Sequence, residues 1–283
     1  CLSSKQKFYG AKSGECQYTI CLDCGFIFQN PRPSEMNMKL WYAELGYLIS
    51  VYQDFGVTEG KLRIEYNRAC RVMNFLRPHF IGGVDSILEI GPGCGLLAEM
   101  LYKETGCDLH LVEPNPLHQK LLGLRTPDAK IYNDISDLDP RSNYNFIVIS
   151  HTLEHIYQPI DFLKELRKFT YSASLLFVSV PNVQWHIAFE IAHMSCFTQE
   201  TLRAMLEATG WEIMQEKGSP SFQKDYRIVK PPFGLWALAI PGDQRRIRIS
   251  YSTKWLKGRR RNAKINTFVS KYIDHEVSGR FIK

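Results

Sequence analysis

Residues 87–97, ILEIGPGCGLL, constrain the fold of this chain more than any other stretch of its sequence. A short apolar run containing Glu89 leads into glycines at alternate positions, Gly91, Gly93 and Gly95, and then into a helical pattern. Glycine is needed where the backbone takes positive φ or where a ligand approaches a position that a Cβ would block. We therefore expect a strand, a tight turn and a helix, with a ligand held at the turn.

The pattern matches a dinucleotide-binding fingerprint only in part. That fingerprint is G-x-G-x-x-G, and Leu96 occupies the position of its last glycine. Further along, the strand-like run 109–112 ends in Glu113, at the spacing expected for an acid that accepts hydrogen bonds from ribose hydroxyls. The ligand is therefore expected to carry a ribose, and a dehydrogenase is the least favoured enzyme class.

Several further motifs follow in a fixed order. The pattern E-x-G-x-G-x-G is followed by VEP (112–114), by the acid of Asp134-Ile135, by ISHTLEHIYQP (149–159), by VSVPN (178–182) and by CFTQETLRAMLEATGWE (196–212). Together they cover roughly half of the chain, and their order is more specific than any single motif. In this order they resemble the class I S-adenosylmethionine (SAM) dependent methyltransferases.

The resemblance implies a Rossmann-like α/β fold, with a mostly parallel seven-stranded sheet and helices on both faces. Continuous apolar runs such as FIVIS and LLFVSV suit buried parallel strands. We expect strands near residues 86–90, 108–113, 129–132, 145–150, 174–180 and 211–216. The expected domains are a zinc-ribbon-like element at 1–30, a helical lid or linker at 31–80, the SAM-binding domain at 81–217 and a basic extension at 218–283.

Ligands of open α/β sheets bind outside the carboxyl ends of the strands. The resemblance assigns the glycine turn to the amino-acid and ribose parts of SAM, Glu113 to the ribose diol, and Asp134 with the Ile135 amide to adenine. Glu89 is expected to contact the methionine ammonium indirectly. The full set of expected cofactor-binding residues is Glu89, Gly91, Pro92, Gly93, Gly95, Glu113, Pro114, Asp134, Ile135, Ser150 and His151.

The candidate catalytic bases are histidines, whose ordinary pKa of about 6.5 suits proton removal near neutrality. His151 follows the fourth strand and is expected to act as a base or as a substrate contact, with His155 beside it. His186 and His193, in the connection after the fifth strand, are further candidates. A divalent metal is the alternative to a base, since the ubiquinone-biosynthesis O-methyltransferases bind one through E-x-x-E-H here, although His151 replaces the first acid.

The amino-terminal cysteines suggest a structural zinc site. Cys21 and Cys24 form a C-x-x-C-G turn, which needs a second pair to complete four ligands. The segment CLDCGFIFQNPRP resembles the second half of the zinc ribbon that often begins sugar-modifying methyltransferases. In that pattern Cys1 is the second member of the first pair, whose first member would precede this sequence. The alternative is a redox-inert pair in a small hairpin.

Charge is distributed unevenly along the chain. From residue 221 onward there are 15 Lys and Arg against 4 Asp and Glu, whereas residues 1–220 carry a net charge of −5. The basic extension, which includes KGRRRNAK, favours an anionic acceptor or a peripheral contact with an acidic membrane. Eight cysteines without an apolar leader favour a reducing cytoplasm, and no run reaches the roughly 20 apolar residues of a membrane span.

The sequence thus predicts a SAM-dependent methyltransferase, with O-methylation of a sugar, nucleotide-sugar or glycan precursor in a surface-polysaccharide or secondary-metabolite pathway as the leading function. One rival is a methyltransferase of nucleic acid or protein, although no NPPY-type motif follows the fourth strand. The other is a non-catalytic scaffold, which the intact glycine turn and the ribose acid disfavour. The residues leave the acceptor atom and the oligomeric state open.

Overall fold

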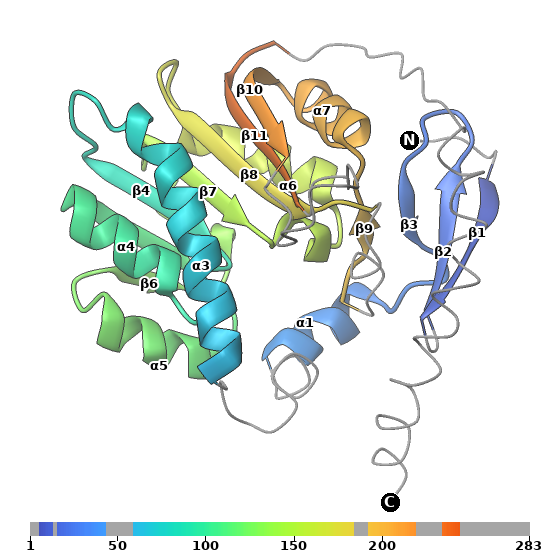
Figure 1. Ribbon diagram of the computed structural model, residues 1–283, viewed down its shortest axis with the longest axis horizontal. Coiled ribbons are helices and arrows are strands. Elements are labelled where there is room, and N and C mark those ends of the chain that lie inside the picture. Colours follow the sequence, from blue (N-terminus) through green and yellow to red (C-terminus); the bar gives the residue numbers. More distant parts are fainter. Residues whose placement is uncertain (1–5, 14–15, 44–58, 184–191, 219–233, 244–283) are drawn as a thin grey trace, which may run out of the picture.

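The structure is a computed structural model that describes residues 6–13, 16–43, 59–183, 192–218 and 234–243. It contains a large sheet covered by helices on both faces and a small sheet at its side (Figure 1). No helix in these ranges is long and apolar enough to cross a membrane.

The large sheet has seven strands in the order β10-β11-β8-β7-β4-β5-β6. Strands β4, β5, β6, β7 and β8 are parallel, and β11 runs antiparallel to both β8 and β10. Because β4 pairs with β5 on one side and β7 on the other, the chain reverses its direction of travel across the sheet at β4. A crevice for a ligand is expected outside the carboxyl ends of these two strands. The bounds are β4 Ser86–Ile90, β5 Asp108–Val112, β6 Lys130–Tyr132, β7 Phe146–Ser150, β8 Leu175–Pro181, β10 Trp211–Gly218 and β11 Gly234–Pro241.

Helices pack on both faces because the strands alternate apolar side chains between two cores. In β4, Ile87 joins the core beneath α3, α4 and α5, whereas Leu88 and Ile90 join the core beneath α6 and α7. Figure 1 shows α3, α4 and α5 together on one side of the sheet. The helix bounds are α3 Glu59–Leu76, α4 Leu96–Thr105, α5 Pro116–Arg125, α6 Pro159–Leu166 and α7 Gln199–Ala208, with short 3-10 turns η1 Arg77–His79, η2 Ile135–Asp137, η3 Leu153–His155 and η4 Arg167–Phe169.

The sheet extends past residue 217, where the sequence analysis ended the catalytic domain. Strand β11, Gly234–Pro241, lies between β8 and β10 as the seventh strand, and its central residues are buried. This apolar run has no alternation and follows a stretch that matches no family motif, so its place in the sheet was not predicted. The rest of the expected basic extension, from residue 244, lies outside the described residues.

The small sheet joins the amino-terminal segment to the main domain. Its strands are β1 Gln6–Ser13, β2 Cys16–Cys21, β3 Ile27–Gln29 and β9 Ser195–Cys196, all antiparallel to their neighbours. Strand β9 comes from the connection between β8 and α7, so the small sheet is completed by the domain that it contacts. The following helix, α1, spans Glu35–Ala43, in agreement with the helix expected in the lid segment.

Candidate active site

The turn after β4 has the conformation that its glycines predict. Gly91, Gly93 and Gly95 have φ values of 66°, 56° and 80°. A Cβ on Gly91 would lie 2.6 Å from Thr152 Cγ2, and one on Gly95 would lie 2.5 Å from Leu122 Cδ2. Only glycine therefore fits at both positions, for reasons of backbone conformation and of space. The turn leaves an open backbone cradle beside the amino terminus of α4.

Glu113 joins this turn to the end of β5. Its carboxylate accepts a hydrogen bond from the Gly93 amide at 3.1 Å and one from the Asn115 amide at 2.9 Å. The residue is 5% exposed, and the Asn115 side chain caps the start of α5. The expected ribose acid thus lies against the glycine turn, with Pro114 between it and the helix that follows.

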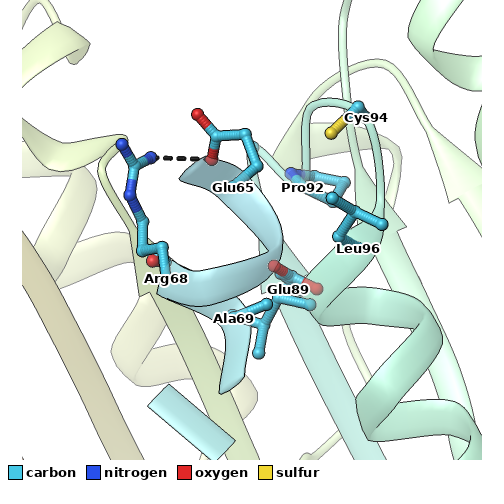
Figure 2. A pocket seen from close by; sticks show the side chains of 10 residues that line it. Glu65, Arg68, Ala69, Glu89, Pro92, Cys94 and Leu96 are labelled. Atoms are coloured by element: carbon cyan, nitrogen blue, oxygen red, sulfur yellow. Dashed lines mark hydrogen bonds and ion pairs between the residues drawn. The ribbon is translucent and has the colours of Figure 1, made fainter. Parts of the chain in front are cut away.

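A pocket opens beside the turn and is covered by α3 (Figure 2). Of the expected cofactor-binding residues, Glu89, Gly91, Pro92 and Ser150 line it. Two residues that the sequence analysis did not identify, Glu65 and Arg68, line it from α3 and form an ion pair at 2.9 Å. Their i,i+3 spacing is that of an ordinary surface pair on a helix, so the sequence contained no signal for this role.

Glu89 is the acid at the base of the pocket. It is 2% exposed, and its Oε2 makes no hydrogen bond among the described residues. Burial, with a smaller contribution from the charge of Glu113, raises the pKa of Glu89 to about 8. A cation placed in the pocket would stabilise the ionised form of this carboxylate.

Asp134 and Ile135 follow β6 at the same edge of the sheet. The Asp134 side chain is exposed and accepts hydrogen bonds from the Ser136 amide and hydroxyl, so it caps the short turn η2. Ile135 packs in part against one of the cores. In this structure Asp134 therefore shapes the loop on which the expected adenine contact depends.

Ser150 and His151 end β7 beside the glycine turn. His151 has a φ of 55°, which is uncommon outside glycine and marks a conformation that the surrounding structure imposes. Its amide donates to the Ser179 carbonyl at 2.8 Å, and its Nδ1 lies 3.6 Å from Glu154 Oε1. The neighbouring Thr152 packs against Gly91. These contacts place His151 and Glu154 next to the cofactor cradle.

His155 and His193 lie together beyond Glu154. Their ring centroids are 4.8 Å apart, and His155 Nδ1 lies 3.0 Å from the Ala192 carbonyl oxygen. Burial, followed by the charge of His193, lowers the pKa of His155 to about 3. Tyr42 of α1 stacks edge-on against His155 and accepts a hydrogen bond from the Asn115 side chain through its backbone carbonyl. Helix α1 therefore contacts both the cofactor side and the histidine side of the site.

The remaining predicted residues divide between the described and the undescribed parts of the chain. His186 and Cys1 lie outside the described residues. Cys21 and Cys24 form no disulfide with each other and lie in a tight turn, in which the Gly25 amide donates to the Cys21 carbonyl at 2.9 Å. Burial raises the pKa of the Cys24 thiol, and the neighbouring Cys21 thiol adds to this effect.

Comparisons with known proteins agree with this geometry. A family model described as a methyltransferase domain matches residues 62–216. A search of curated proteins found no match.

Solved structures match over most of the large domain. A Burkholderia thailandensis 1,6-didemethyltoxoflavin N1-methyltransferase with bound S-adenosylhomocysteine (SAH) covers 79% of this chain and 98% of its own, at 15% identity and a TM-score of 0.57. A Synechocystis magnesium protoporphyrin IX methyltransferase with bound SAH covers 74% of this chain and 100% of its own, at 12% identity and a TM-score of 0.53. At these identities the likeness shows the fold. Because the family model spans more than half of the sequence, the chain belongs to the methyltransferase-domain family and is a SAM-dependent methyltransferase.

Proposed function

We propose that this enzyme methylates a hydroxyl of a sugar, nucleotide-sugar or glycan precursor in a surface-polysaccharide or secondary-metabolite pathway. The observation that carries the proposal is the pair of His151 and buried Glu154, 3.6 Å apart beside the cofactor cradle. A hydroxyl acceptor must lose a proton during methylation, so it benefits from a base held at this point. The two neighbours described above are named as enzymes of small molecules, which supports a small acceptor.

The cofactor-binding residues fit SAM. A Cβ built on Gly93 would meet nothing within 4 Å, so the turn leaves open space for a ligand, and Glu89, whose Oε2 is buried, lines the pocket that would hold the methionine ammonium. We assign the ribose diol to Glu113 and adenine to the loop of Asp134 and Ile135. When bound, SAM supplies an electrophilic methyl group on its sulfonium.

The chain's own residues would then align the acceptor and receive its proton. Holding the acceptor oxygen in line with the methyl and sulfur contributes up to roughly 7–11 kcal/mol in favourable cases. The His151 imidazole would take the proton that the acceptor hydroxyl loses on methylation. Glu154 orients the imidazole and stabilises the positive charge that it gains.

We also propose that the amino-terminal turn forms half of a structural zinc site through Cys21 and Cys24. The turn brings the Cys21 and Cys24 thiols together. For the methyl acceptor, the basic character of residues 221–283 supports an anionic molecule. Substituting Cys21→Ser is expected to remove the one equivalent of zinc held by this turn and to lower thermal stability without changing the affinity for SAH. Zinc content that stays unchanged in this variant would refute the assignment.

The cofactor assignment is tested by calorimetric titration with SAM, SAH and NADH. We expect micromolar binding of SAM and SAH, no binding of NADH, and a loss of roughly 10-fold or more in Glu113→Gln, because a neutral amide accepts a weaker hydrogen bond than a carboxylate. Glu165→Gln on α6, an exposed residue on the other face of the sheet, is the control. Unchanged SAH binding in Glu113→Gln would refute the ribose assignment.

The acceptor is tested by measuring SAH release with nucleotide sugars, with RNA and with protein as candidate acceptors. We expect turnover with a nucleotide sugar or glycan precursor, and a loss of about 10²- to 10⁴-fold in kcat for His151→Gln with SAH affinity unchanged. Turnover with RNA or protein alone would replace the proposed substrate class. Full activity of His151→Gln would refute its role as the base.

A further inference from the structure

A second cluster of ligand-type side chains lies beyond the cofactor cradle. It consists of Glu154 and His155 in η3 and His193 just before β9. One ligand atom from each residue lies within 4.8 Å of the others. The Glu154 and His155 side chains are 1% and 16% exposed, and His193 is 5% exposed. The three residues come from two connections of the sheet, so the tertiary structure assembles them.

The hydrogen bond of His155 defines which of its ring nitrogens faces the cluster. The Ala192 carbonyl, 3.0 Å from Nδ1, can only accept a hydrogen bond, so Nδ1 carries the proton. The other nitrogen, Nε2, therefore presents its lone pair toward Glu154 Oε1, 3.9 Å away. Histidines that bind metals usually donate their other ring N–H to a carbonyl or carboxylate in this way.

The spacing of the cluster also suits a metal ion. A distance of 3.9 Å between Nε2 and Oε1 exceeds a hydrogen bond. Bonds of about 2.0–2.2 Å to a tetrahedral ion place neighbouring ligand atoms roughly 3.4 Å apart, so adjustments below about 1 Å would bring these atoms to an ion between them. A divalent cation would also compensate the charge of a carboxylate that is removed from water.

The small sheet holds the third ligand in place. The Tyr18 hydroxyl donates to the His193 carbonyl at 3.1 Å, and the backbone N–H of Gln29 donates to the Met194 carbonyl at 3.1 Å. Tyr18 and Gln29 are themselves buried, and β3 pairs with β9 directly after this segment. The backbone of His193 is thereby fixed against η3, which is the preorganisation that a metal site requires.

We propose that Glu154, His155 and His193 bind one divalent transition-metal ion, of the kind that favours two imidazoles and a carboxylate, such as Zn²⁺, Co²⁺ or Ni²⁺. This ligand set differs from E-x-x-E-H, because its third member lies in another connection and His151 is not part of it. With three protein ligands, a bound ion would have open coordination positions for an oxygen of the acceptor. The ion would then lower the pKa of the acceptor hydroxyl. That role for the acceptor rests on the proposed function, whereas the binding of the ion does not.

The test uses Co²⁺, whose absorption reports its ligands. The double variant Cys21→Ser, Cys24→Ser provides the background, so that the amino-terminal thiols do not compete for the ion. In this background we expect one equivalent of Co²⁺ to bind with visible d–d absorption and without thiolate charge transfer. Glu154→Gln and His193→Gln should each weaken binding by about 100-fold or more, a larger loss than the 10- to 100-fold typical of residues that only orient a ligand.

Two variants serve as controls. His110→Gln replaces another buried histidine that has a carboxylate neighbour, Asp108, and should leave Co²⁺ affinity unchanged. His151→Gln should also retain the ion, which separates a metal site from a purely protonic His151–Glu154 pair. Co²⁺ affinity that is unaffected by Glu154→Gln and His193→Gln, or lost in His151→Gln alone, would overturn the proposal.

A third variant is expected to gain an absorption band, and a protein that fails to fold would not produce this result. In the same background, His193→Cys should introduce a thiolate-to-cobalt charge-transfer band, because the new thiol would ligate the ion. Absence of that band in a protein that still binds SAH would also overturn the proposal. SAH binding is measured in every sample, so a failed cofactor assignment and a failed metal site give different results.

Discussion

Arg68 offers a sharp test of how the pocket recognises its cofactor. Among the residues that line the pocket in the described part of the chain, it is the one cationic side chain. SAM and SAH carry an α-carboxylate, and an arginine is well suited to bind it through two parallel hydrogen bonds. Figure 2 shows Arg68 and its partner Glu65 on α3, with Glu89 below Glu65 and with Pro92 and Cys94 of the turn beside it. We therefore expect Arg68 to exchange part of its contact with Glu65 for the cofactor carboxylate.

The magnitude follows from the class of interaction. Hydrogen bonds to charged groups contribute about 1.5–3 kcal/mol, so Arg68→Ala should weaken SAH binding roughly 10- to 140-fold. Losing the ion pair with Glu65 should reduce the free energy of unfolding only slightly. Its two side chains are 25% and 19% exposed, and pairs near the surface contribute at most about 1 kcal/mol. The variant should therefore fold and melt close to the parent protein.

The assay compares two ligands by titration calorimetry. SAH has the amino-acid carboxylate, whereas 5′-methylthioadenosine lacks it, so Arg68→Ala should affect only the first. Arg63→Ala is the matched control, because Arg63 lies on the same helix and pairs with Glu59 in an exposed position. An equal loss for both ligands, or no loss for SAH, would refute the reasoning.

Two further predictions concern Glu89 and the glycines. The pKa of Glu89 in the fold, about 8, lies above its ordinary value of 4.5, so the contribution of this residue to stability is complete below pH 4.5 and is lost as the pH rises through 8. Glu89→Gln should flatten this fall in thermal scans. Pairing of Glu89 with the cofactor ammonium should release a proton at pH 7, seen as a dependence of binding enthalpy on the buffer, which Glu89→Gln abolishes; a parent protein without this dependence would contradict the pairing. Gly95→Ala should destabilise the fold by at least about 1–2 kcal/mol in denaturant titrations, whereas helical Gly123→Ala, with open space around its Cβ, should stabilise it by about 0.5–1 kcal/mol; a neutral Gly95→Ala would contradict the strain argument.

The expected core of the fold is confirmed where local signals were strong. Six strands of the large sheet lie within two residues of the expected bounds, from β4 to β10. Strands β7 and β8 are apolar runs, FIVIS and LLFVSVP, and such runs become strands because burying them requires paired backbone groups. The glycine turn was predicted equally well, because few residue types other than glycine adopt a positive φ at alternate positions.

The local sequence contained no comparable signal for contacts between distant segments. Strand β11 inserts between β8 and β10, and β9 contributes only two residues to the small sheet, so pairing partners rather than local pattern define both. Met194 shows the same point. It is buried just before β9 and outside any helix, and its carbonyl accepts a hydrogen bond from the distant Gln29 backbone N–H.

The sequence by itself determined the class of the site, because the chemistry of a nucleoside cofactor demands glycines and an acid at short, fixed spacing. Gly91 and Glu113 were predicted from those spacings, and Glu89 from the resemblance to class I methyltransferases. Only the tertiary structure decided which distant residues join the site: Arg68, from a helix before the sheet, lines the pocket with Glu89 and Gly91, and His193, from a connection beyond it, lies beside Glu154 and His155. Their positions depend on long-range packing, and the free energy of that packing is distributed over two cores and a second sheet rather than encoded in neighbouring residues.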